Sequence, residues 1–263
     1  MKVLFIGDIV GKSGRQAISK LLPRILKSES IDFCIANVEN AAGGLGVTPD
    51  VVFGLIDNGI DVLTSGNHIF DKKSVIEIID KEDRLIRPLN YPSTCPGSGY
   101  NISYLKGNVS VVTINISGRV FMESIDCPFK VISEKLKDLG DSYNIIIVDF
   151  HAEATSEKIA MGYYLDGKVS AVIGTHTHVQ TADEKILPNG TGYITDVGMT
   201  AAFDSVIGMT KEKALARFLT KMPQKFEVAK KDKRLSGVII EIDPLKGITT
   251  GIKRVFESAE DYP

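Results

Sequence analysis

The sequence predicts an α/β fold made of two mixed sheets with helices on the outside, and three observations lead to this prediction. Apolar runs of strand length alternate with helix-like stretches, which is typical of βαβ units and parallel strands. From residue 99 the pattern changes to paired strands around a tight turn, and further antiparallel strands are expected near the end. The 263 residues, 43% of them hydrophobic, suffice for a substantial core.

The parallel part of the fold is predicted from five apolar runs. KVLFIG, DFCIANV and DVLTSG have the length of strands, and residues 13–28 and 48–58 between them have a helical pattern. NIIIVDF and SAVIG, with the helix-like stretch SEKIAMGYYL between them, indicate a second region of the same kind. We therefore expect parallel strands joined by helices in both regions.

Antiparallel pairs are expected at two places. GYNISYL and VSVVTINI lie on either side of Gly107 and Asn108, which predicts a hairpin at a sheet edge or in a second sheet. KILPNGTGYIT, GVIIEIDP and GITTGIKRVF predict further antiparallel strands, and a helix is expected at about residues 210–221. Residues 88–99 are expected to form a long irregular loop. No comparable composition shift marks a boundary, so we expect one domain over residues 1–263.

Composition and charge exclude several classes of protein. With 31 basic and 33 acidic residues the net charge is −2, which gives no global field for binding nucleic-acid polymers. The apolar start of the chain is too short for a membrane span and has no cleavage-site pattern, so we expect a cytoplasmic protein. The three cysteines, Cys34, Cys95 and Cys127, are widely spaced, which argues against a disulfide framework and a thiolate zinc site.

Polar side chains follow five of the apolar runs, and they include every histidine of the chain. They are Asp8; Glu39 and Asn40; Asn67 and His68; His151; and His176 and His178. Functional groups of α/β sheets gather beyond the carboxyl ends of the strands. Unrelated turn residues would explain any one of these endings, but they explain all five poorly. On an extended segment His176 and His178 would point the same way, so both imidazoles could face one point.

This set of side chains predicts a metal centre that acts on phosphoesters. Imidazole nitrogens with carboxylate and amide oxygens suit manganese, iron or zinc, and they suit calcium less. The ligands suffice for two ions, which can bind opposite sides of a phosphoryl group and activate water for in-line attack. The stretch GDIVGKSG is not a nucleotide-binding P-loop, because only three residues separate Gly7 from Gly11 and Asp8 would repel phosphates.

The same residues resemble the calcineurin-like metallophosphoesterases, whose signature combines D-x-H, G-D, G-N-H-[DE], a lone histidine and G-H-x-H. The matching pieces here are GDIV, VEN, GNHIFD, DFHAE and GTHTH. Departures occur at Val10, Ile69 and Thr175, and Glu39 and Asn40 stand where Gly-Asp is expected. These departures, and stretches such as GDIVGKSGR, DFHAEATSEK and YITDVGMT, are similar to the bacterial YmdB-like subfamily over nearly the whole chain.

The resemblance implies a four-layer αββα sandwich with a dinuclear centre and phosphodiesterase activity, including action on 2′,3′-cyclic nucleotides by metal-activated hydroxide attack. Two metal ions, iron or manganese by preference and zinc or magnesium as alternatives, would be the cofactors. Carried over residue by residue, the first ion would be held by Asp8, Glu39 and His178. The second would be held by Glu39, Asn67, His151 and His176, with Glu39 bridging. Because Val10 leaves the first site one ligand short, water or Asn40 would complete it.

His68 is the one histidine without a ligand role, and we expect it to act as the general acid. An imidazole beside the substrate can protonate the departing alkoxide near neutral pH. Two further residues have open roles: Glu153 and Asp196 would either orient ligand histidines or act as turn and cap residues.

Two other functions stay open at this point. A dinuclear centre also serves a phosphomonoesterase or protein phosphatase, and the chain could be a regulatory metalloprotein with incidental slow catalysis. The expected partner is a small phosphodiester or nucleotide substrate, without a membrane or a nucleic-acid polymer. The sequence leaves open whether the protein forms a homo-oligomer.

Overall fold

The first sheet contains seven strands and holds the amino-terminal half of the predicted site. We analysed a computed structural model, which describes residues 1–140 and 142–260. The strand order is β2-β11-β12-β1-β3-β4, with β13 beside β12. β1, β3 and β4 are parallel, and β12 runs antiparallel to β1, β11 and β13. The strands are β1 (Lys2–Ile6), β2 (Asp8–Ile9), β3 (Phe33–Asn37), β4 (Val62–Thr64), β11 (Met199–Ala202), β12 (Lys233–Asp243) and β13 (Ile248–Ser258).

The second sheet contains six strands in the order β5-β6-β7-β8-β10-β9. β6, β7, β8 and β10 are parallel, whereas the edge strands β5 and β9 are antiparallel to their neighbours. Both sheets are therefore mixed, as expected, and the predicted hairpin forms the edge of this sheet. The strands are β5 (Tyr100–Leu105), β6 (Val109–Ser117), β7 (Ile145–His151), β8 (Ala171–Thr175), β9 (Lys185–Ile186) and β10 (Gly192–Ile194).

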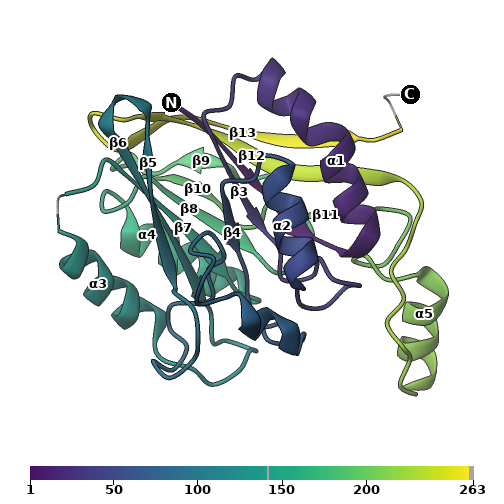
Figure 1. Cartoon of the computed structure of the whole chain (residues 1–263). Coiled ribbons are helices and arrows are strands. Elements are labelled where there is room, and N and C mark those ends of the chain that lie inside the picture. Colours follow the sequence, from purple (N-terminus) through teal and green to yellow (C-terminus); the bar gives the residue numbers. More distant parts are fainter. Residues whose placement is uncertain (141, 261–263) are drawn as a thin grey trace.

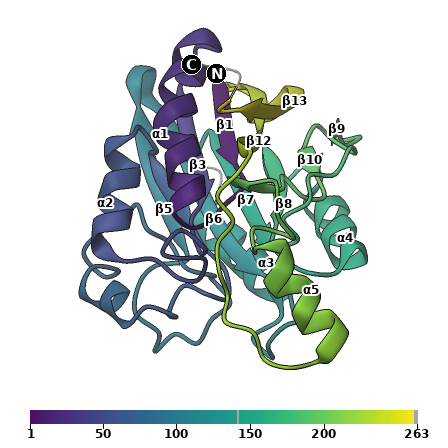
Figure 2. The same ribbon diagram turned by 90° about the vertical axis from the view of Figure 1, so that its right-hand side faces the viewer.

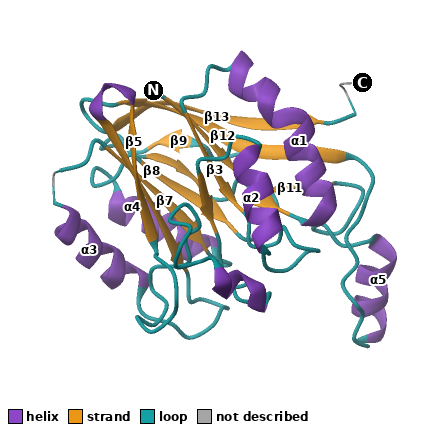
Figure 3. Cartoon of the chain, viewed as in Figure 1, coloured by secondary structure: helices purple, strands orange, loops and turns teal. Residues whose placement is uncertain are grey.

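Helices cover the outer faces of the two sheets (Figures 1 and 3). α1 and α2 lie on the side of the first sheet and α4 on the side of the second (Figure 2). The α-helices are α1 (Gly11–Ser28), α2 (Pro49–Asp57), α3 (Pro128–Leu139), α4 (Thr155–Leu165) and α5 (Lys211–Thr220), and two short 3-10 helices cover Lys73–Glu77 and Lys106–Asn108. None of the described helices combines the length and the apolar character that a membrane crossing needs.

Three apolar clusters hold the layers together, and β1 shows how. Leu4 and Ile6 pack with α1 in one cluster, while Val3 and Phe5 pack between the sheets with β6 and β7. A third cluster joins the outer face of the second sheet to α3 and α4. Side chains alternate between the faces of a strand, so a central strand buried on both faces must be apolar throughout. The chain therefore forms the four-layer αββα sandwich that the resemblance implied.

Helix α3 and strand β10 differ from the sequence prediction. Helix α3 was not expected, although its apolar residues Phe129, Ile132, Leu136 and Leu139 recur at helical spacing. β10 was expected to be purely antiparallel, but it pairs parallel with β8 as well as antiparallel with β9. The irregular loop at residues 88–99 is confirmed.

Candidate metal centre

The predicted site residues gather where the carboxyl ends of the parallel strands of both sheets meet. These residues end or follow β1, β3, β4, β7 and β8: Asp8, Glu39, Asn40, Asn67, His151, His176 and His178. Hydrogen bonds cross between the two sheets here, for example from Asn37 at the end of β3 to Asp149 of β7 at 3.1 Å. The topology thus places side chains far apart in the sequence at one edge of the sandwich.

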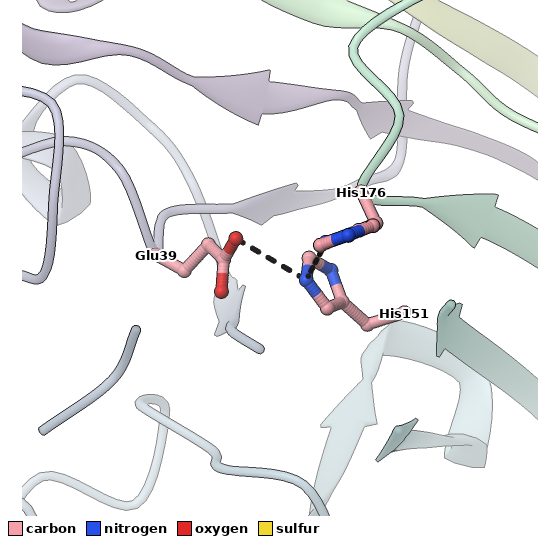
Figure 4. Close-up of side chains that lie close together, drawn as sticks. All are labelled: Glu39, His151 and His176. Atoms are coloured by element: carbon pink, nitrogen blue, oxygen red, sulfur yellow. Dashed lines mark hydrogen bonds and ion pairs between the residues drawn. The ribbon is translucent and has the colours of Figure 1, made fainter. Parts of the chain in front are cut away.

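The ring nitrogen Nε2 of His151 is the centre of the tightest cluster (Figure 4). It lies 3.2 Å from Glu39 Oε1, 3.2 Å from Asn67 Oδ1 and 2.9 Å from His176 Nδ1. Ligand atoms of Glu39, His151 and His176 all lie within 4.8 Å of one another. The structure therefore brings together all four residues that the resemblance assigned to the second ion.

Within this cluster, His151 is the residue that carries a positive charge. Burial disfavours a charged His151, but the Glu39 carboxylate outweighs this effect and raises the pKa of His151 to about 9. In turn, although burial opposes its ionisation, His151 lowers the pKa of Glu39 to about 2. Burial and the neighbouring His151 lower the pKa of His176 to about 3. A proton on His151 thus stands at the place that a metal cation would take.

Asp8, Asn40 and His178 form an adjoining group. Asp8 Oδ1 lies 3.8 Å from His178 Nε2, and the Asn40 amide nitrogen lies 3.2 Å from the same ring atom and 3.1 Å from Glu39 Oε1. Burial raises the pKa of Asp8, which is fully enclosed. Val10, where the family signature has histidine, is also buried, with Met199 and Ala201, and offers no ligand atom.

The turn after β4 leaves room for Glu39 and His151 to approach each other closely. A Cβ atom at Gly66 would lie 2.3 Å from the His151 ring and 2.4 Å from Glu39 Oε2, so only glycine fits there. The turn also sets His68 beside the cluster: its backbone N–H donates to Glu39 Oε2 at 3.1 Å. Its Nδ1 lies 2.8 Å from Asp71 Oδ2, and the side chain is 31% exposed, so substrate can reach it.

The H-x-H segment is not extended, which corrects the expectation from its sequence. β8 ends at Thr175, and His176 and His178 have φ angles of 101° and 66°, in the left-handed region that non-glycine residues rarely adopt. Backbone strain of this kind persists only where surrounding contacts hold it. Here Asp8 Oδ2 accepts from the His176 N–H at 3.2 Å, and His178 Nδ1 lies 3.0 Å from the carbonyl oxygen of Ile207.

Sequence reasoning missed a buried ion pair that supports the same segment. Lys158 Nζ of α4 lies 2.6 Å from Asp196 Oδ2 and donates to the Thr175 carbonyl oxygen at 2.6 Å. Asp196 also accepts from the backbone N–H groups of Thr177 and Gly198 at 3.0 and 2.8 Å. Of its two open roles, Asp196 therefore has the turn role. The helical pattern of α4 gave no sign that Lys158 points inward.

Glu153 takes the other of the two open roles. Its Oε2 lies 3.1 Å from His176 Nε2, so this carboxylate accepts a hydrogen bond from the ring nitrogen that faces away from the cluster. The opposite nitrogen, Nδ1, is then the one directed at His151 and Glu39. His176 is thus oriented with a lone pair toward the centre.

The donor atoms fit metal cations. Asp8 Oδ1 is buried and has no hydrogen-bond partner among the described residues, although it is an acidic oxygen beside an imidazole. Buried polar atoms are nearly always paired, and a metal cation bound here would pair with this one. Glu39, Asn67 and His176 converge on a second point, where the absent Cβ of Gly66 leaves room. Mixed oxygen and imidazole ligands are those of iron, manganese and zinc centres.

An αββα sandwich whose strand ends carry this centre defines a metallophosphoesterase. The model of the YmdB-like proteins matches residues 4–255, and the chain belongs to this family. Membership implies the use of divalent metal ions, for which Glu39, His151 and His176 provide a binding cluster.

Three relatives agree with this assignment. The chain is 46% identical over 256 residues to the 2′,3′-cyclic-nucleotide 2′-phosphodiesterase of Bacillus subtilis, covering 97% of this chain and 96% of the relative. A crystal structure of a hypothetical protein from Thermus thermophilus has a TM-score of 0.92 at 40% identity, covering 98% of this chain and 99% of that one. A novel phosphatase from Mycoplasma pneumoniae has a TM-score of 0.93 at 33% identity, covering 98% and 93%.

Proposed function

We propose that this protein is a metal-dependent phosphodiesterase that opens 2′,3′-cyclic nucleotides. Cleavage of the bond between phosphorus and the 2′ oxygen would leave a 3′-nucleotide. The observation that carries the proposal is the convergence of Glu39, Asn67 and His176 on His151 Nε2 in a buried centre. The name of the Bacillus subtilis relative supports the choice of substrate.

We assign the ligands of two ions from the contacts in the centre. One ion would be held by Glu39, Asn67, His151 and His176, and the other by Asp8, Glu39 and His178, with Asn40 or water completing it. When bound, the ions would polarise the phosphoryl group and lower the pKa of the attacking water. Iron or manganese is the proposed metal, and zinc and magnesium are the alternatives.

His68 is the proposed general acid. Its Nδ1–H donates to Asp71 Oδ2 at 2.8 Å, so Nε2 is the atom available to the substrate. Asp71 fixes the orientation of the ring, as a carboxylate partner does for catalytic histidines. The proton on Nε2 would pass to the departing 2′ oxygen of the ribose. His68 thus supplies the proton while its own backbone N–H holds Glu39 in place.

Two broader proposals accompany this function. We propose that residues 1–263 form one catalytic domain, and the support is that both sheets contribute ligands to the same centre. We also propose that the protein works in the cytoplasm, and the support is that its three cysteines are unpaired thiols, as in reducing compartments.

A substrate panel tests the proposed function. Protein reconstituted with manganese or iron is assayed against 2′,3′-cyclic AMP, a chromogenic diester and matched monoesters. We expect a higher kcat/KM for the diesters and a 3′-nucleotide as the product. Inactivity toward every diester with both ions bound would overturn the proposal. A preference for monoesters would favour a phosphatase, the name that the Mycoplasma pneumoniae structure bears.

A further inference from the structure

A buried chain of hydrogen bonds leads from the metal centre into the second sheet. His151 Nδ1 lies 2.9 Å from Thr175 Oγ1, and this hydroxyl donates to Asp149 Oδ1 at 2.7 Å. His151 and Thr175 are paired neighbours on β7 and β8, and Asp149 lies two residues before His151 on the same face of β7. All three side chains are fully buried, so no water competes for these bonds.

Asn37 lies at the far end of this series of hydrogen bonds, and two backbone groups fix its side chain. The side-chain N–H groups of Asn37 donate to the Ser65 carbonyl oxygen at 3.0 Å and to Asp149 Oδ2 at 3.1 Å. Its oxygen Oδ1 accepts from the Glu39 backbone N–H at 3.2 Å. A carbonyl oxygen only accepts and an N–H only donates, so the orientation of the Asn37 amide is determined. Both hydrogens of its nitrogen are therefore used, and Asp149 must accept.

The direction of donation then follows for the hydrogen bonds from Asp149 through Thr175 to His151. Thr175 has one hydroxyl hydrogen, and it is directed at the Asp149 carboxylate. The oxygen of this hydroxyl therefore faces His151 Nδ1 with a lone pair, and the ring must donate there. A neutral imidazole with hydrogen on Nδ1 has its lone pair on Nε2, the atom that faces Glu39, Asn67 and His176.

We propose that Asp149 and Thr175 are positioning residues that hold His151 in the tautomer whose Nε2 binds the metal. The inference rests on the proposed role of His151 as a ligand. Outer partners of this kind typically contribute 10–100-fold to metal affinity, by orders of magnitude found in other metal sites. Here the carboxylate acts through a hydroxyl, and Thr175 stands where the signature of the superfamily has a histidine.

We expect Asp149→Asn to reverse the direction of donation in the hydrogen bonds from residue 149 to His151. Asn37 still donates, so the new amide must turn its oxygen toward Asn37 and its nitrogen toward Thr175. The Thr175 hydroxyl would then accept from that nitrogen and donate to His151 Nδ1, which favours hydrogen on Nε2 and opposes metal binding. Replacing Thr175 by valine as well removes its hydroxyl, so this hydroxyl no longer favours hydrogen on His151 Nε2. The double variant D149N/T175V should therefore bind metal no more weakly than D149N alone.

Metal titrations of substituted proteins test the role of the hydroxyl. Thr175→Val should weaken manganese and zinc binding about 10–100-fold, whereas Thr175→Ser, which keeps the hydroxyl, should bind like the parent. Thr113→Val is the matched control: Thr113 on β6 is equally buried, and its hydroxyl has no partner within the described part of the chain. Unchanged affinity in T175V, or equal losses in T175V and T175S, would overturn the inference.

The tautomer itself is measured by ¹⁵N NMR of the zinc-loaded parent protein, which needs no variant to fold. We expect a hydrogen on His151 Nδ1, protected from exchange, and zinc on Nε2; zinc on Nδ1 would overturn the inference. Neither measurement uses turnover. A protein that shows this tautomer and the T175V loss but hydrolyses no diester would refute the proposed function and keep the inference.

Discussion

His151 Nε2 and His176 Nδ1 lie 2.9 Å apart, and the planes of the two rings are at 80° to each other. Two ring nitrogens at this distance cannot both present lone pairs without repulsion, so a proton or a cation must stand between them. Glu39 and Asn67 add oxygens on the same nitrogen of His151. Metal binding at this centre must therefore displace a proton, and several expectations depend on this exchange.

Metal affinity should rise with pH up to about pH 9. The pKa of His151 is raised to about 9, so below this pH the ring carries the proton that a metal must displace. Between pH 7 and 9 the release of one proton lowers the apparent Kd about tenfold per pH unit, and above pH 9 this contribution ends. Competition with a chelator at several pH values measures the slope, and calorimetry in two buffers counts the protons. A Kd that is constant from pH 7 to 9 would be incompatible with this exchange.

Glu39→Gln should reduce the metal content below one ion per chain. Glu39 is assigned to both ions, and its substitution removes the negative charge between two cations. Elemental analysis after dialysis measures the bound metal. Glu157→Gln is the control, because Glu157 is also a buried glutamate, but it accepts from the backbone N–H groups of Arg119 and Val120 instead. Two tightly bound ions in the Glu39→Gln protein would show that the bridge is assigned wrongly.

Gly66→Ala should abolish metal binding and lower the thermal stability. The added Cβ would lie 2.3 Å from the His151 ring, and overpacking of this kind costs roughly 1–3 kcal/mol. Gly54→Ala is the control, because Gly54 lies within α2 with nothing inside 4 Å of its Cβ position. There the change should add about 0.5–1 kcal/mol of stability and leave metal content unchanged. A metal-loaded Gly66→Ala protein of normal stability would contradict the packing described for the centre.

His68→Ala should keep both ions and lose about 10²–10⁴-fold in kcat, the range for a general acid. The loss should be small for a diester with a p-nitrophenolate leaving group, which needs little protonation, and large for a ribose hydroxyl. Asp71→Asn should show a smaller loss with the same dependence on the leaving group, because Asp71 orients the His68 ring. Equal losses on both substrates would count against the acid role, and loss of metal would make His68 a ligand.

The strands of the fold were predictable where burial on both faces makes a run apolar, as at Val3–Ile6 of β1. The short strand β2 was not, because two residues have no periodicity and its pairing with β11 depends on contacts with a distant part of the chain. Helix α3 was missed although it was predictable, because Phe129, Ile132, Leu136 and Leu139 recur at the spacing of an amphipathic helix.

The centre was predictable because polar residues at strand ends stand out against apolar runs, as Glu39 and His151 do. Among its supports, Glu153 and Asp196 were singled out in the sequence, but two others were not. Asp149 lies inside an apolar run, and Lys158 looks like an exposed helical residue, yet both are buried with partners from other elements. Such roles depend on which strands are neighbours, and the apolar pattern of the sequence does not show the strand order. The left-handed backbone of His176 and His178 likewise depends on Asp8 and Asp196.

The most direct test is the rate of 2′,3′-cyclic AMP hydrolysis as metal-free protein is titrated with manganese or iron(II), with the product identified by chromatography. The proposed centre predicts activity that rises until two equivalents of metal are bound per chain, with 3′-AMP as the product. Chelation should abolish this activity, and added metal should restore it. An absence of hydrolysis at two bound equivalents, or full activity in metal-free protein, would contradict the proposal.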